Sequence, residues 1–322
     1  MILSGGLTFS GGLTVTPQPP SYLAYAIFGY GYNAGGSTQF SITNLVSNTG
    51  VVATDTAGVG TARNGLAAAG YGSDKAIFGY GTAVYPTLLS MTNLVSNTGV
   101  VATDTAGVGT SRTSLAAAGY GTDKAIFGFG YTADFVYTAI TNLVSNTGVV
   151  GNNVTGVGLA RSGLAAASYG TDKAIFGFGV TNTGPSGGYV QTNYSMTNLV
   201  SNTGVVASDT TGVGTARFGL AAAGYGTDKA IFGFGYVSVQ VSTTNLVSNT
   251  GVVATDTTGV GTGKFYLAAA TYGTDKAIFG YGQASGYSSI TNLVSNTGVV
   301  STDITGVGTA RTSLAAASYG ST

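Results

Sequence analysis

The side chains that could do chemistry are few, and nearly all of them recur at fixed spacing. The chain has 322 residues, 11 basic and 11 acidic, and contains no His, Cys or Trp. Without His and Cys, it cannot form a Ser-His-Asp or Cys-His nucleophile, a zinc site of the usual ligands or a haem ligated by His. Only Asp, Lys, Arg, Tyr and hydroxyl side chains remain, so we expect no enzymatic activity and no cofactor.

A basic residue recurs twenty positions after the start of each copy of the phrase TNLVSNTGVV. An Arg there could bind an anionic ligand through its planar fork of donors. We expect instead a structural role, in which each guanidinium bonds backbone carbonyls between repeats. Lys cannot make the bidentate contacts of Arg, so we expect the fifth repeat to be slightly weaker. The series is Arg63, Arg112, Arg161, Arg217, Lys264 and Arg311.

Carboxylates also recur once per repeat, which raises the possibility of calcium binding. The series is Asp55, Asp104, Asp209, Asp256 and Asp303, with Asn153 in the third repeat. Each repeat supplies only one such carboxylate, so we favour a turn or strand-end cap and expect no metal. A second set, of which Asp74-Lys75 is the first pair, predicts polar turns. Asp134 is the one charged residue outside the pattern, and a single carboxylate is no acid–base pair.

The chain consists of six repeats of 47 to 56 residues, a period typical of propellers and solenoids. Copies of TNLVSNTGVV begin at Thr43, Thr92, Thr141, Thr197, Thr244 and Thr291. Each repeat contains four apolar segments separated by the turn sequences G(S/T)DK and SNTG. They predict short strands at positions such as 66–72, 75–81, 42–46 and within 51–57. With 54 glycines, long helices are not expected.

The two ends of the chain supply complementary parts of one repeat. The C-terminal LAAASYGST contains only a first strand, whereas SYLAYAIFGYG near the N-terminus begins with a second strand. Joining them closes a ring and removes exposed sheet edges. We therefore predict an all-β fold: a six-bladed β-propeller of four-stranded antiparallel blades over residues 21–322, with the C-terminal strand innermost in the closing blade. An open solenoid is the alternative. Residues 1–20 are expected to form an N-terminal arm or linker.

The order of motifs resembles the kelch repeat family. Arg112, the small-residue strand LAAAGYG, the strand KAIFGFG and the phrase TNLVSNTG follow one another as the corresponding kelch segments do. The resemblance covers about residues 26–322 and implies the propeller fold. It departs in two places: the adjacent glycine pair becomes Gly-Phe-Gly or Gly-Tyr-Gly, and the expected Trp is absent. Kelch propellers include oxidases and adaptors, so the resemblance implies no single function.

All length variation lies in one loop per repeat, between the second and third strands. The six loops are 32–42, 82–91, 131–140, 180–196, 236–243 and 283–290, and they are rich in Tyr, Ser, Gly and Asn. In antiparallel blades these loops share one rim with the variable residues that follow each basic residue. Such composition is typical of binding surfaces, although loops under weak constraint also drift. The expected contacts are Tyr32, Tyr85, Tyr131, Tyr137, Tyr189, Tyr194, Tyr236, Phe265, Tyr266 and Tyr287.

Charge and the N-terminal leader bear on partners and localisation. The formal net charge is zero, which argues against nucleic-acid binding. No apolar run is long enough for a membrane span, and the N-terminus does not look like a signal peptide. The leader SGGLTFSGGLTVT resembles those on structural proteins of marine tailed phages. We expect a non-catalytic, virion-associated protein whose arm docks on other virion proteins. The alternative is an extracellular carbohydrate-binding propeller that contacts a cell-surface glycan or receptor.

Overall fold

The computed structural model describes residues 23–33, 38–183 and 190–321. Within these residues every regular element is a β-strand, which confirms the predicted all-β class. The expected N-terminal arm and Tyr189 lie outside the described residues. Each repeat forms a three-stranded antiparallel sheet, and a two-stranded pair, β2 (Tyr32–Asn33) and β3 (Thr38–Gln39), lies in the first variable loop.

The six sheets have the same strand order, with the second strand in the middle. The first strands are β5 (Ala67–Tyr71), β8 (Ala116–Tyr120), β11 (Ala165–Tyr169), β14 (Ala221–Tyr225), β17 (Ala268–Tyr272) and β20 (Ala315–Ser321). The second strands are β6 (Lys75–Gly79), β9 (Lys124–Gly128), β12 (Lys173–Thr183), β15 (Lys229–Gly233), β18 (Lys276–Gly280) and β1 (Leu23–Gly29). The third strands are β7 (Thr92–Val95), β10 (Thr141–Val144), β13 (Val190–Val200), β16 (Thr244–Val247), β19 (Thr291–Val294) and β4 (Thr43–Val46).

Burial along the strands explains their composition. In β6, Ala76, Ile77 and Phe78 have no exposed surface, because both faces of the middle strand pack against neighbouring sheets. The first strands contact one another around the centre, so they must carry small side chains. A Cβ added at Gly70 would lie 3.2 Å from the carbonyl oxygen of Ser318 in the adjacent first strand. Crowding near the centre therefore accounts for the repeated Ala and Gly.

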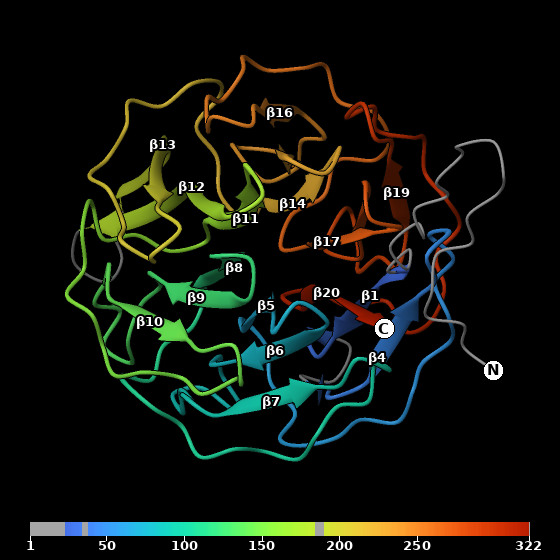
Figure 1. The fold of residues 1–322 in the computed structure, drawn as a ribbon. Helices are drawn as coiled ribbons and strands as arrows, with labels where there is room; N and C mark the ends of the chain where they lie inside the picture. Colours follow the sequence, from blue (N-terminus) through green and yellow to red (C-terminus); the bar gives the residue numbers. More distant parts are fainter. Residues whose placement is uncertain (1–22, 34–37, 184–189, 322) are drawn as a thin grey trace, which may run out of the picture.

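The first strands form a closed ring, and the two ends of the chain complete it. Each first strand contacts the next, from β5 through β8, β11, β14 and β17 to β20, and β20 contacts β5. The C-terminal β20 pairs antiparallel with β1 from Leu23↔Ser321 to Gly29↔Ala315. Figure 1 shows the six sheets around a common centre, with the first strands innermost. The predicted pairing of the chain ends is confirmed, and the arrangement is consistent with a propeller.

In the described part of the chain no repeat has a regular fourth strand, so the predicted four-stranded blades are three-stranded sheets. The outer segment after β4 makes only two isolated bridges to it, Val46↔Val52 and Thr43↔Thr56. Between them the outer segment has one residue more than β4, as in a β-bulge. The Asn44 side chain donates to the Ala53 carbonyl at 3.0 Å and to the Asp55 carboxylate at 2.9 Å. These bonds accompany the irregular pairing, and the other repeats show the same pattern of bridges.

Two closed rings of backbone hydrogen bonds join all six units, one at each end of the first strands. In the ring beside the variable loops, each N–H donates to the carbonyl of the equivalent residue in the preceding unit, over 2.6 to 2.9 Å. Its members, all with positive φ, are Gly65, Ser114, Gly163, Gly219, Tyr266 and Ser313. In the opposite ring, glycine N–H groups donate to carbonyls of the following unit over 2.7 to 3.0 Å. These donors are Gly72, Gly121, Gly170, Gly226, Gly273 and Gly320.

Candidate functional site: the variable loop face

The variable loops are anchored by pairing with the residue that follows each basic residue. Asn64 bridges Thr82, for example, and Thr82 also bridges Leu88 across the loop. The two variable segments of a repeat therefore lie side by side. They lie at the end of the sheet opposite the turn that joins the first strand to the second, such as 72–75. We call this end the variable face, comprising the six loops and the first backbone ring, and the other end the constant face.

In the fourth repeat the variable segment is a hairpin and not the loop that the sequence predicts. Strands β12 and β13 continue in register to Thr183↔Val190, with a shift between Gly177 and Gly179. Tyr194 therefore lies on a strand, where its hydroxyl is 3.0 Å from Thr181 Oγ1. Alternating Val, Thr, Asn and Tyr in this segment suit a strand, a signal that the glycines at its tip obscure.

Aromatic side chains on the variable face gather in three clusters. In the first, the Tyr131 ring lies 5.6 Å from Phe135 and 6.2 Å from Tyr137, and Phe135 lies 5.7 Å from Tyr85. In the second, the Phe265 ring lies 4.9 Å from Tyr266 and 5.1 Å from Tyr236, with Phe218 alongside. The third is the pair Tyr32 and Tyr287, 6.0 Å apart.

The structure thus brings together eight of the predicted contact residues, in separate groups, and leaves Tyr194 apart. Tyr85 is exposed, whereas the other described candidates are half-buried by their neighbours. The Tyr137 hydroxyl accepts a hydrogen bond from the backbone of Asn182 in the next loop, at 2.8 Å. The sequence analysis missed Phe135 and Phe218 because it weighted tyrosine. The available signal was their position, since Phe135 lies in a variable loop and Phe218 directly follows a basic residue of the Arg series.

Tyr266 lies at the mouth of the ring's axis. It occupies the one position of the first backbone ring that carries neither Gly nor Ser, and it lines a small axial pocket of about 80 Å³ with Leu267 and the other ring residues. Burial raises the pKa of its hydroxyl, and the nearby phenols of Tyr131, Tyr32 and Tyr137 raise it further. Tyr266 therefore stays neutral, and its ring packs beside Phe218 and Phe265.

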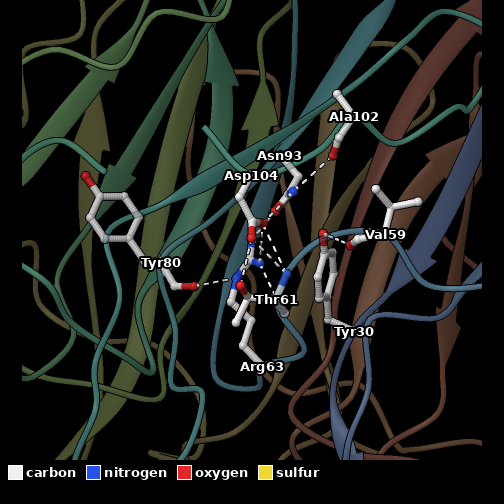
Figure 2. Close-up of polar contacts among 8 residues, drawn as sticks. All are labelled: Tyr30, Val59, Thr61, Arg63, Tyr80, Asn93, Ala102 and Asp104. Carbon is white, nitrogen blue, oxygen red and sulfur yellow. Dashed lines mark hydrogen bonds and ion pairs between the residues drawn. The ribbon is translucent and has the colours of Figure 1, made fainter. Parts of the chain in front are cut away.

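The predicted structural Arg series lies in the seams between units, away from the variable surface. Figure 2 shows the first seam, where Arg63 has no exposed surface. Its Nε donates to the carbonyl of Tyr80 at 2.9 Å, and its guanidinium also donates to Asn93 Oδ1 at 2.6 Å. The guanidinium carbon lies 4.3 Å from the centre of the Tyr30 ring, which belongs to the neighbouring unit. Each such cation therefore connects two units.

The repeated Asp carboxylates reinforce the same seams. Asp104 accepts hydrogen bonds from the N–H of Thr61 at 3.0 Å and from its hydroxyl at 2.7 Å, across the seam. Burial opposes ionisation, but these bonds and one from Asn93 outweigh it and lower the pKa of Asp104. Within the described residues no three carboxylates gather as metal ligands would. The position caps a segment of the adjacent unit.

Lys264 makes fewer contacts than the arginines it replaces. Its Nζ donates to the carbonyl of Ile290 at 3.0 Å and to Asn292 Oδ1 at 2.8 Å, but it makes no bond to the Tyr281 carbonyl, the position that an Arg Nε contacts in the other seams. Burial lowers the pKa of Lys264 to about 8. This seam therefore holds a buried cation with fewer hydrogen bonds than the arginine seams have.

The constant face carries the Asp-Lys pairs and the wider end of the axis. Lys75 Nζ lies 2.7 Å from the adjacent Asp74 carboxylate, and four further turns repeat this pair. An axial cavity of about 300 Å³ opens there, lined by hydroxyl groups including Ser168, Thr271 and Ser318. Ser168 and Thr271 donate to carbonyls of neighbouring first strands at 2.8 Å. These hydroxyls therefore link adjacent units of the ring.

The described part of the chain contains no helix long and apolar enough to cross a membrane. No protein-family model matches the chain. No curated protein matches it either.

Proposed function

We propose that the chain is a non-catalytic binding and structural protein, a kelch-like six-bladed β-propeller that presents its variable face to a partner. The observation that carries this proposal is the gathering of aromatic side chains on one face of a ring whose seams are built from nearly identical contacts. Tyr and Phe rings supply large contact areas at low entropic cost. A rigid ring that varies on one side only is suited to recognition.

We propose further that the protein is a component of a phage virion, docked through its N-terminal arm on other virion proteins. The support is the leader sequence, the zero net charge and the repetition of one unit. Mass spectrometry of purified particles tests this role. The expected result is peptides of this chain in particles that have passed a density gradient. Their absence from pure particles, with the chain present in the lysate, would contradict the proposal.

A second candidate is an extracellular carbohydrate-binding propeller, and one observation favours it. Tyr85 and Phe135 present stacked rings to solvent, where the apolar face of a sugar could pack. Recovery of the protein from the medium or the cell surface, in place of particles, would favour this candidate.

A further inference from the structure

Tyr85 and Phe135 form an exposed aromatic patch at one side of the variable face. They are 54% and 57% exposed, and every other aromatic side chain in the described residues is buried or half-buried. Their rings stack at 5.7 Å with an interplanar angle of 28°, although they come from neighbouring loops. The Tyr85 hydroxyl also donates to the Ala133 carbonyl at 3.4 Å. Val84 and Val136 extend the patch, at 73% and 59% exposed.

Phe135 holds its exposed position at a conformational cost. In a tight hairpin, the Thr132 N–H donates to the Val136 carbonyl and the Phe135 N–H donates to the Thr132 carbonyl, each at 3.0 Å, and Phe135 has a φ of 57°. Hairpins of this kind favour glycine at the left-handed position. A side chain there costs about 1 to 2 kcal/mol. Phe135 gains little burial in return for this strain. We therefore look for the reason for its exposed ring in a ligand that the ring could contact.

The charges around the patch limit what it can bind. Asp134 is exposed at the tip of the same hairpin. None of the chain's 11 basic residues reaches this face: six are buried in the seams, and five lie in the turns of the constant face. An acidic ligand would meet Asp134 with no cation to offset it. The patch therefore suits a ligand with apolar faces and hydrogen-bond donors, and without acidic groups.

We propose that Tyr85, Asp134 and Phe135 form a binding site for a glycan that carries no acidic groups. The C–H face of a sugar ring would pack on the exposed rings, and its hydroxyl groups would donate to the Asp134 carboxylate. This inference rests on the proposed role of the variable face in binding. It adds the location of the site and the chemical class of the ligand.

An array of defined neutral, amino-sugar and acidic glycans, followed by calorimetry on the best binder, tests the site. We expect the wild type to bind glycans without acidic groups and to reject acidic ones. Phe135→Gly should weaken binding about tenfold while leaving the melting temperature unchanged or higher, because glycine relieves the strained φ. Tyr85→Ala, in the other loop, should weaken binding similarly. Tyr287→Ala, in a separate cluster of the same face, tests the alternative location. Val149→Ala, at an exposed apolar residue outside the variable face, is the control and should keep wild-type affinity.

Three results would contradict the proposed glycan site, and none of them decides whether the protein is a virion component. If the wild type binds no glycan, or binds only acidic ones, the ligand class is wrong, while particle mass spectrometry still tests the virion role independently. If Tyr287→Ala abolishes binding and Phe135→Gly does not, the variable face binds but the location is wrong. If Phe135→Gly lowers the melting temperature by several degrees, Phe135 is a packing residue and the strain argument fails.

Discussion

Each seam between units contains a buried cation, and the six seams are not equal. Four arginines have a repeated Asp carboxylate within 4.0 Å, as Arg161 has with Asp209 at 3.7 Å. Arg112 faces Asn153, which bonds Thr110 from its amide and cannot supply charge. A buried cation that lacks a paired carboxylate or a full set of hydrogen bonds makes the folded state less stable. We therefore expect the seams of Arg112 and Lys264 to be the weaker ones.

Removing one seam arginine should destabilise the whole ring. In the wild type, Arg161 donates to the Phe178 carbonyl at 2.7 Å and to Asn198 Oδ1 at 2.8 Å. Arg161→Ala leaves both acceptors without this donor, so we expect the free energy of unfolding to fall by about 3 to 5 kcal/mol. Arg161→Lys is the matched control, because Lys264 shows that the seam accepts a lysine, and it should lose about 1 to 2 kcal/mol. Urea unfolding measures both. Equal losses for the two variants would show that the guanidinium contacts are unimportant.

Lys264 gives stability a specific pH dependence. Its pKa is about 8 in the folded chain and 10.5 ordinarily. Between these values the unfolded chain binds more protons, so the free energy of unfolding rises with pH, by at most about 1.4 kcal/mol per unit. Relative to Lys264→Met, the wild type should therefore gain stability between pH 8 and 9.5. Working below pH 10 avoids Tyr30 and Tyr281, whose raised pKa values of about 12 act in the opposite direction. A constant difference between the two proteins would contradict this.

At the residue level the sequence predicted which side chains recur, and that the arginines bond backbone carbonyls, but not the aromatic rings that pack against them. The spacing of the Arg series indicated a structural position, and Arg63 lies in a seam. The aromatic residue of AIFG(Y/F)G reads as the end of a strand, yet Tyr30 has a φ of 65° and turns its ring into the seam. The left-handed conformation of a large residue has no signature in residue type, so the sequence does not predict it for Tyr30 or for Phe135.

At the level of elements, pairing of β20 with β1 closes the ring, and its loss should open it. Deleting residues 314–322 removes the strand that β1, β5 and β17 all contact. The exposed edge of β1 should then pair with other copies, and we expect aggregates by size-exclusion chromatography with light scattering. A monomeric truncation with unchanged melting temperature would show that β20 does not hold the ring together.

Strand positions in the inner part of each repeat follow from the sequence, whereas the outer part does not. The pattern KAIFG predicts 75–81, and the strand spans Lys75–Gly79. The outer segment has the apolar pattern of a strand, but its pairing with β4 is broken by a bulge, beside which Asn44 donates to Ala53 and Asp55. A side chain that competes for backbone groups is visible only once the register is known.

Across the whole molecule, ring closure separates a constant face from a variable one. The two backbone rings fix every unit at both ends of its first strand, so changes in one loop need not propagate to the next unit. The sequence predicted this division from where the repeats differ in length. It could not predict which aromatic residues meet, because the clusters join loops from different repeats, as Tyr85 and Phe135 do.

A single engineered disulfide between the chain ends measures ring closure most directly. Ala24 and Gly320 are register partners in β1 and β20, and the chain has no cysteine of its own, so Ala24→Cys with Gly320→Cys allows only one intramolecular disulfide. Ala24→Cys with Asp134→Cys, on opposite faces, is the control. We predict that mild oxidation of dilute native protein forms the 24–320 bond within one chain and leaves the control reduced. Free thiols or only disulfide-linked dimers in the 24–320 variant would contradict a closed ring.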